Sequence, residues 1–103
     1  GVTMEITHGH SGPWYLTDPH SAVGEAAQRA LRAAFGKEPA LIREGGSIPI
    51  VSQFRTILGV ETLLLGLALS DCRAHSPNEN FPLANLEAGI RLNKAVLSEL
   101  AKK

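Results

Sequence analysis

The fold class rests on one apolar stretch, Thr62-Leu63-Leu64-Leu65-Gly66-Leu67-Ala68-Leu69. Its apolar residues follow one another without the alternation that marks a strand with one face in water. A continuous apolar run of this length is typical of a strand that is buried on both faces of a parallel sheet. We therefore expect residues 62–69 to form a central strand with helices packed against it.

Two more strands and three helices are expected along the rest of the chain. The strands are the alternating residues 2–8 and the short apolar run 40–42. The helices are expected over residues 18–36, 47–59 and 83–101, and Asp18 and Ser47 are the expected N-caps of the first two. The order β-α-β-α-β-α predicts an α/β fold, a fragment of a mostly parallel sheet flanked by helices.

Each expected helix has an apolar face at intervals of three and four residues. In the first helix this face is rich in alanine: Val23, Ala26, Ala27, Ala30, Leu31 and Ala34. In the second it comprises Ile50, Val51, Phe54, Ile57 and Leu58. In the third we expect Leu86, Ile90, Leu97 and Leu100 to face inward.

Composition limits the classes of function. The 103 residues carry ten basic and ten acidic side chains, so no charge excess favours nucleic acid or an anionic membrane as a partner. Hydrophobic residues make up 44% of the chain and charged residues 19%, which indicates a folded core. No apolar stretch approaches the roughly 20 residues that span a bilayer. The single cysteine, Cys72, excludes an internal disulfide and favours a reducing compartment, so we expect a cytoplasmic protein.

The beginning of the chain suggests a piece of something longer. Gly1 is followed at once by a strand-like pattern, without an initiator methionine. Three strands are also few for a sheet whose faces and edges need cover. We expect the missing strands in sequence outside this chain, and a domain boundary near Thr17.

The first candidate site is the loop Arg43-Glu44-Gly45-Gly46-Ser47-Ile48-Pro49. Paired glycines allow close approach of the backbone to a ligand, and a helix start behind them offers unpaired N–H groups to an anion. With Arg43 nearby, the loop could clamp a carboxylate or an oxyanion. A flexible turn in which Ser47 only caps a helix is an equally good interpretation.

The second candidate site is the loop Asp71-Cys72-Arg73-Ala74-His75-Ser76-Pro77-Asn78-Glu79. His75 is the best candidate for a metal ligand or an acid–base group, and Glu79 could orient its imidazole. From spacing alone, a histidine bonded to the backbone is the simpler interpretation. Cys72 is better explained as a small buried thiol than as a nucleophile. His8 and His10 could form half of a metal site, but no further ligands accompany them, and exposed histidines at a strand end are the safer interpretation.

Three motifs in order carry a family resemblance: Gly36-Lys37-Glu38-Pro39, the residue 43–49 loop, and Ala74-His75-Ser76-Pro77-Asn78-Glu79. At these spacings, with a closing Gly89-Ile90 helix, the chain resembles the C-terminal quarter of the dizinc aminoacylase, carboxypeptidase and succinyl-diaminopimelate desuccinylase family. The branch that it resembles most is that of the cytosolic dipeptidases of carnosinase type. The resemblance covers nearly the whole chain.

The resemblance implies a domain assignment and a set of roles. Residues 1–17 resemble the last strand of a lid domain that often dimerises, and residues 18–103 the end of a hydrolase-like catalytic domain. His75 matches a histidine that ligates one of two divalent ions, with zinc expected and manganese or cobalt as alternatives. Gly45, Gly46 and Ser47 match the loop that receives the substrate carboxylate. Arg43 and Glu79 match positions of these motifs with supporting roles.

By the same resemblance, the whole protein hydrolyses the amide bond of dipeptides, small peptides or N-acyl amino acids with a free carboxylate, by a two-metal mechanism, and forms a homo-oligomer. The remaining metal ligands and the catalytic glutamate are not in this chain, so we expect the fragment to be inactive alone and to hold no catalytic residue. Two alternatives remain open at this point: a small non-catalytic α/β module that binds an anion or a partner, and a relative that has lost catalysis.

Overall fold

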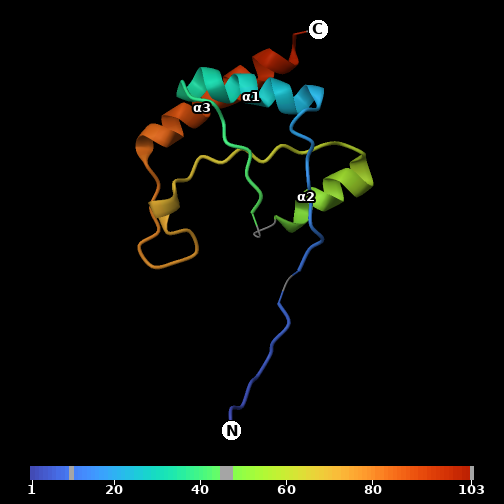
Figure 1. Cartoon of the computed structure of the whole chain (residues 1–103), viewed down its shortest axis with the longest axis vertical. Coiled ribbons are helices and arrows are strands. Elements are labelled where there is room, and N and C mark those ends of the chain that lie inside the picture. Colours follow the sequence, from blue (N-terminus) through green and yellow to red (C-terminus); the bar gives the residue numbers. More distant parts are fainter. Residues whose placement is uncertain (10, 45–47, 103) are drawn as a thin grey trace. The chain divides into compact units, whose positions relative to one another are not determined.

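The computed structural model describes residues 1–9, 11–44 and 48–102 (Figure 1). Its elements are α1 (Ala22–Phe35), α2 (Pro49–Gln53), a π-helical turn η1 (Phe54–Leu58), a 3₁₀ turn η2 (Ser70–Cys72) and α3 (Leu83–Leu100). Within the described ranges the backbone forms no β-strand. The architecture is therefore helical.

The predicted α/β fold class, a β-α-β-α-β-α fragment of a mostly parallel sheet, is contradicted by this structure. A strand exists only where its main-chain groups pair with a neighbouring strand, and an apolar run specifies burial without specifying that pairing. Along residues 62–69 the half-buried side chains of Leu63, Leu65 and Leu67 alternate with exposed positions, and Leu64 is 56% exposed. The run is covered on one side, and not on both as predicted.

The chain divides into two compact units. One comprises Gly1–Leu16 and Arg43–Thr62, and the other comprises Thr17–Ile42 and Leu63–Lys103. The predicted assignment of residues 1–17 to a lid domain and residues 18–103 to a catalytic domain stays a prediction.

The helix α1 begins at a serine N-cap and ends at a glycine C-cap. Ser21 is the N-cap, and its Oγ accepts a hydrogen bond of 3.1 Å from the Gly24 N–H. Asp18, the predicted cap, lies three residues earlier, and its side chain accepts a bond of 2.9 Å from the His20 N–H. Gly36 ends the helix with a φ of 66°, as its place in the sequence predicts, because glycine takes this left-handed conformation without steric cost.

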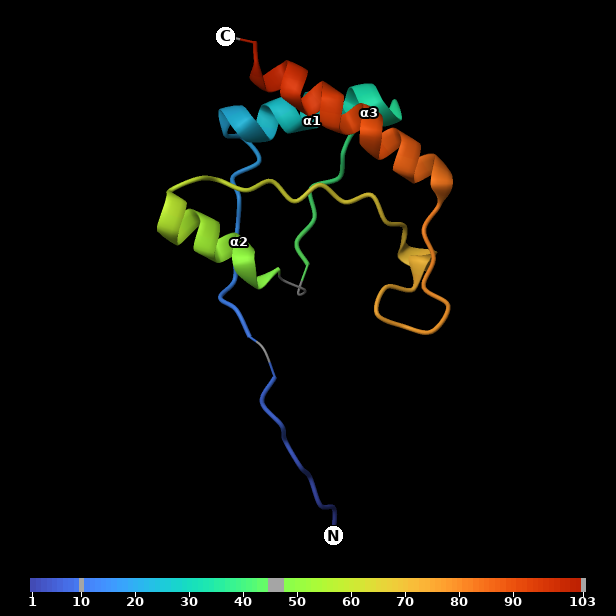
Figure 2. The ribbon, with the colours of Figure 1, turned by 180° about the vertical axis from the view of Figure 1, so that it is seen from behind.

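The larger unit is held together by α1 and α3, which lie side by side in both ribbon views (Figures 1 and 2). Most of their buried residues are small: Gly24, Ala26, Ala27 and Ala30 in α1, and Ala88 and Gly89 in α3, where the larger Leu92 is also buried. A Cβ placed on Gly89 would lie 2.7 Å from Leu67 Cδ1, so the extended segment also approaches α3 closely. The predicted alanine face of α1 is confirmed.

The predicted inward face of α3 is wrong. Leu86, Ile90, Leu97 and Leu100 are exposed, with Leu97 at 70%. A face of alanine and glycine lets two helices approach more closely than a leucine face does, and a single partner helix covers only one stripe. The leucine stripe is therefore left outside the contact.

One ion pair joins the two helices near the C-terminus. Arg29 Nε donates to Glu99 Oε2 at 2.7 Å, and Lys102 also donates to the Glu99 carboxylate. The Glu99 side chain is only 15% exposed, and the hydrogen bond from Arg29 is the main reason that the pKa of this carboxyl is held below 4.5. On the exposed surface, Arg32 and Glu38 form a second, bidentate pair, whose hydrogen bonds lower the pKa of Glu38 and raise that of Arg32.

The smaller unit is organised around Tyr15. Its hydroxyl accepts a hydrogen bond of 2.8 Å from the Thr62 N–H, and the Arg55 guanidinium lies 5.9 Å from the centre of its ring. The predicted helix 47–59 is interrupted, because α2 passes into the π-helical turn η1 before Gly59 ends it at a φ of 65°. Of its predicted apolar face only Val51 is buried.

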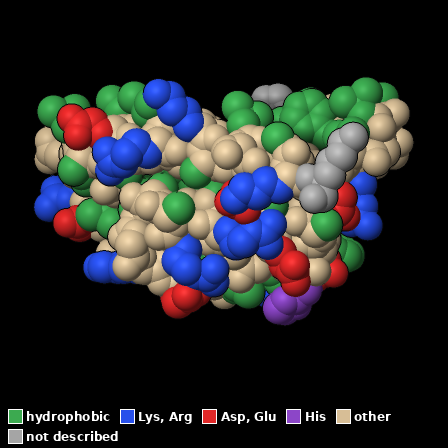
Figure 3. Space-filling model, turned by 90° about the horizontal axis from the view of Figure 1, so that it is seen from above, with side chains coloured by type: hydrophobic (Ala, Val, Ile, Leu, Met, Phe, Trp, Pro, Cys, Tyr) green, Lys and Arg blue, Asp and Glu red, His purple; other side chains and the backbone are tan. Residues whose placement is uncertain are grey.

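Charges of both signs occur on the face drawn in Figure 3. In the described part of the chain, no helix combines the length and the apolar character needed to cross a membrane.

The close contact between α1 and α3 makes Ala30 intolerant of a larger side chain. Ala30→Leu should lower the free energy of unfolding by roughly 1–3 kcal/mol, because the added carbon atoms of leucine cannot be placed without moving a helix. Ala33→Leu, at an exposed position of the same helix, should change it by less than about 0.5 kcal/mol. Urea unfolding followed by circular dichroism measures both. Equal effects of the two substitutions would show that α1 does not use this face.

The Glu99 ion pair predicts a dependence of stability on pH. A carboxyl whose pKa is lowered by folding stabilises the protein above its ordinary value of 4.5, and this contribution is lost as the pH falls through the folded value. Glu99→Gln should therefore lower the melting temperature at pH 7, and the difference from wild type should shrink as the pH falls below 4.5 and disappear once the pH is below the folded pKa. Glu87→Gln is the matched control, since Glu87 is an exposed residue of α3 and no ion pair is found for it among the described residues. A pH-independent difference would contradict the assignment.

Candidate functional site

His75 lies on a closed loop that leads from η2 toward α3. The loop is closed at its base by the Asn80 N–H, which donates to the Cys72 carbonyl at 3.0 Å. Three of its non-glycine residues have left-handed backbone: Arg73 (φ 55°), His75 (φ 60°) and Asn78 (φ 61°). Non-glycine residues adopt this conformation rarely, and they keep it where the surrounding contacts impose it.

The base of this loop is anchored by Cys72. Its side chain is 3% exposed, and its Sγ accepts a hydrogen bond from the Leu69 N–H at 3.1 Å. The Cys72 N–H in turn donates to the Leu69 carbonyl at 3.1 Å. The prediction of a small buried thiol is confirmed, and the thiol is used to hold the loop.

The His75 side chain itself is exposed, and none of the hydrogen bonds found among the described residues involves its imidazole. The simpler interpretation from sequence, a histidine bonded to the backbone, is therefore not what the structure contains. An exposed imidazole with both nitrogens available suits a metal ligand. Within residues 1–9, 11–44 and 48–102, however, no three His, Cys, Asp or Glu side chains come close enough to hold an ion together. The donor chemistry fits one ligand of a site whose other ligands come from elsewhere.

The other predicted residues are placed less completely. Gly45, Gly46 and Ser47 lie outside the described residues, as does His10. Arg43 is exposed in the smaller unit, and Ile48 occupies the N-cap position of α2, where Ser47 was expected. Glu79 is exposed in the larger unit, and no hydrogen bond joins it to His75 in the part of the chain that is described. The roles of Arg43 and Glu79 stay predictions.

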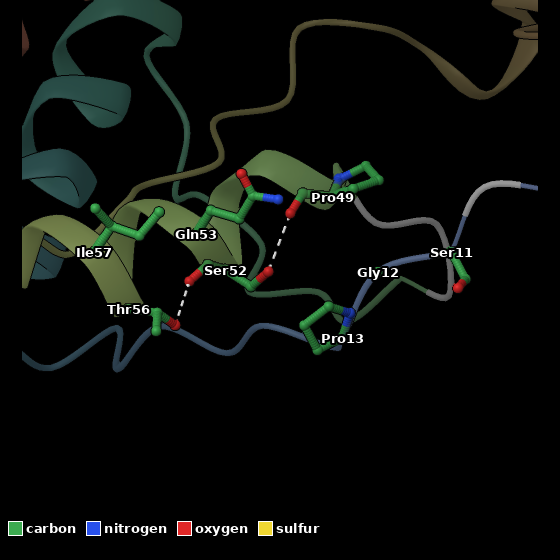
Figure 4. Close-up of a pocket in the computed structure, with 8 residues that line it drawn as sticks. All are labelled: Ser11, Gly12, Pro13, Pro49, Ser52, Gln53, Thr56 and Ile57. Atoms are coloured by element: carbon green, nitrogen blue, oxygen red, sulfur yellow. Dashed lines mark hydrogen bonds between the residues drawn. The ribbon is translucent and has the colours of Figure 1, made fainter.

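A hollow of about 410 Å³ lies in the smaller unit beside α2 (Figure 4). It is lined by Ser11, Gly12, Pro13, Pro49, Ser52, Gln53, Thr56 and Ile57. The two helical hydroxyls are turned back onto the helix, since Ser52 Oγ donates to the Pro49 carbonyl at 3.0 Å and Thr56 Oγ1 to the Ser52 carbonyl at 2.9 Å. These groups are satisfied internally, so the hollow offers little polar recognition.

Sequence reasoning missed the residues that shape the His75 loop. Ser76 and Asn80 make the hydrogen bonds that close it, and neither was singled out. Their residue types were the available signal, because serine and asparagine commonly bond to nearby backbone in turns.

The relationship of the chain to known proteins follows from its sequence and its backbone. A model of peptidase family M20/M25/M40 matches residues 2–99. The chain belongs to this peptidase family. The resemblance drawn from the three motifs is thereby confirmed.

Two curated relatives illustrate the branch. The Cys-Gly metallodipeptidase DUG1 of Saccharomyces cerevisiae is 38% identical over 88 residues, which are 85% of this chain and 18% of the relative. The Beta-Ala-His dipeptidase of Homo sapiens is 39% identical over 77 residues, which are 75% of this chain and 15% of the relative. The chain thus spans less than a fifth of the length of either protein.

A solved structure shares the backbone course of the chain. The di-peptidase Dug1p from Saccharomyces cerevisiae superposes with a TM-score of 0.85 at 35% identity, over 91% of this chain and 20% of that one. At this identity the likeness extends beyond the fold to the sequence that builds it.

Because His75 stands without further ligands in the described structure, residues 1–103 alone should bind Zn²⁺ weakly. Zinc sites in proteins use three or four protein ligands, and one imidazole supplies only a small part of that affinity. Calorimetric titration of the chain with Zn²⁺ should show no saturable one-to-one binding, and His75→Ala should change the heats little. Tight stoichiometric binding would reveal a ligand set within this chain.

Proposed function

We propose that the chain is part of a metal-dependent dipeptidase and contributes one metal ligand, His75, and one substrate-binding loop, residues 43–49. The observation that carries the proposal is the family match over residues 2–99, combined with an exposed imidazole on a loop of defined shape. Relatives named as a Cys-Gly metallodipeptidase and a Beta-Ala-His dipeptidase support dipeptides as the substrate class, and we propose dipeptides with a free carboxylate. Family membership favours this function over the non-catalytic binding module.

The chemistry assigned to the site is amide hydrolysis. Two divalent ions, which we propose to be zinc, would supply the charge that acidifies a water molecule and polarises the scissile carbonyl. His75 would serve as a neutral imidazole ligand, and its exposed position leaves a ring nitrogen lone pair free for this. In the residue 43–49 loop, backbone N–H groups of Gly45 and Gly46 would approach the substrate carboxylate, and Arg43 would supply the opposite charge.

Under this proposal, residues 1–103 are inactive on their own. The remaining metal ligands and the general base must come from other parts of the complete protein, since the described residues hold no such cluster. We also propose that the complete protein is a homo-oligomer in the cytoplasm. The support for this is the large number of exposed apolar side chains, including Val2, Met4 and Ile6, and the single free cysteine.

The test is His75→Ala in the complete dipeptidase of which we propose this chain to be part. Removal of one ligand should reduce bound metal from two ions toward one and lower kcat on the order of a hundredfold or more. His20→Ala is the matched control, because His20 is another exposed histidine of the same unit and lies outside the proposed site. Metal analysis and dipeptide kinetics measure both variants. Full metal content and full activity of His75→Ala would overturn the assignment.

A further inference from the structure

The turn that carries His75 is held by the residue that follows it. Ser76 donates twice to the same acceptor, the Arg73 carbonyl: its N–H at 3.1 Å and its Oγ–H at 2.6 Å. The second bond is at the short end of the range for hydroxyl donors. Residues 73–76 thus form a four-residue turn with His75 at its third position.

This turn imposes an unusual backbone on His75. The φ of His75 is 60°, and that of Arg73, whose carbonyl accepts both bonds, is 55°. Two left-handed non-glycine residues within one turn are unfavourable by themselves and persist only where other contacts require them. In the described structure, the two bonds from Ser76 are the contacts that cross this turn.

The base of the loop is fixed independently of the turn. The Asn80 N–H bonds to the Cys72 carbonyl, and Asn80 Nδ2 lies 3.4 Å from the Asp71 carbonyl and 3.3 Å from that of Asn78. Loss of the Ser76 hydroxyl would therefore leave the loop attached and closed. The backbone at His75 would gain conformational freedom.

We propose that the Ser76 hydroxyl is a positioning residue for His75: it holds the imidazole in the direction in which it meets the metal. The inference rests on the function proposed above, and it adds a residue that touches neither metal nor substrate. The imidazole of His75 has no hydrogen bond of its own to orient it in the described part of the chain, so its direction depends on the backbone that carries it. Histidine ligands are ordinarily oriented by a partner on the second ring nitrogen; here the turn takes over that role.

The experiment compares three variants of the complete dipeptidase: Ser76→Ala, which removes the hydroxyl, Ser76→Thr, which keeps one, and Ser98→Ala. Ser98 is the matched control, because it is an exposed serine of α3 whose side chain makes none of the hydrogen bonds found among the described residues. Zn²⁺ is titrated into each metal-free protein against a chromophoric chelator, and the melting temperature of each metal-free protein is recorded.

Ser76→Ala should weaken binding of one Zn²⁺ about tenfold, at the lower end of what loss of an orienting contact causes. Ser76→Thr should restore most of that affinity, and Ser98→Ala should match wild type. The melting temperatures of the metal-free proteins should agree, because a hydroxyl on an exposed loop contributes little to global stability. In kinetics, kcat of Ser76→Ala should fall with little change in KM.

Three outcomes overturn the inference while leaving the proposed function intact. One is a Ser76→Ala protein whose zinc affinity equals that of Ser98→Ala. The second is a loss of zinc affinity that Ser76→Thr does not restore, and the third is a loss of affinity together with a lower melting temperature of the metal-free protein. Either of the last two marks a merely structural role. A wild-type protein that binds no metal and cleaves no dipeptide would instead overturn the proposed function and the inference with it.

Discussion

The close contact between α1 and α3 is the interaction on which the larger unit depends. It is built from the smallest side chains in the sequence, with Ala26, Ala27 and Ala30 on one helix and Ala88 and Gly89 on the other. Such residues contribute little apolar area each, but they let two backbones approach and fill the space between them without rotamer strain. The Arg29–Glu99 ion pair then ties the helices together near the C-terminus of the chain.

The same contact determines where the rest of the unit can go. Leu67 fits against Gly89 because glycine has no Cβ, and Asn85 of α3 donates to the Leu67 carbonyl at 2.7 Å. The extended segment is therefore fastened to α3 shortly before η2 and the His75 loop begin. These contacts fasten the segment before the loop to α3, and the other end of the loop leads into the start of α3.

The His75 loop has a buried anchor at its base and an exposed histidine. Cys72 is buried and holds the base, whereas His75 is exposed and makes no internal hydrogen bond in the described structure. An exposed side chain on a sparsely populated backbone conformation is an arrangement that recurs at ligand-binding sites. Among the described residues, no three His, Cys, Asp or Glu side chains come close enough to hold a metal ion together.

The sequence by itself determined the two long helices, the helix ends at Gly36 and Gly59, and the family. Periodicity and capping residues act over a few neighbours, so the alanine face of α1, the extent of α3 and the stops at Gly36 and Gly59 could be predicted locally. The three motifs sufficed for the family because their order and spacing are properties of the sequence alone. The two loops were recognised as candidate sites for the same reason.

Only the tertiary structure decided which segments of the chain contact one another. The apolar run 62–69 has the composition of a buried strand, but strand pairing depends on partners far away in the chain, and in the described residues it packs on one side of a helical unit. Likewise α3 carries an apolar stripe at Leu86, Ile90 and Leu97, yet the residues that it buries are Ala88, Gly89 and Leu92, because close packing of two helices favours small residues. The backbone at His75 was beyond prediction too, since its conformation comes from two hydrogen bonds across a turn. Local sequence patterns indicate which residues prefer burial or a given backbone conformation. The surface against which those residues pack depends on segments that are distant in the sequence.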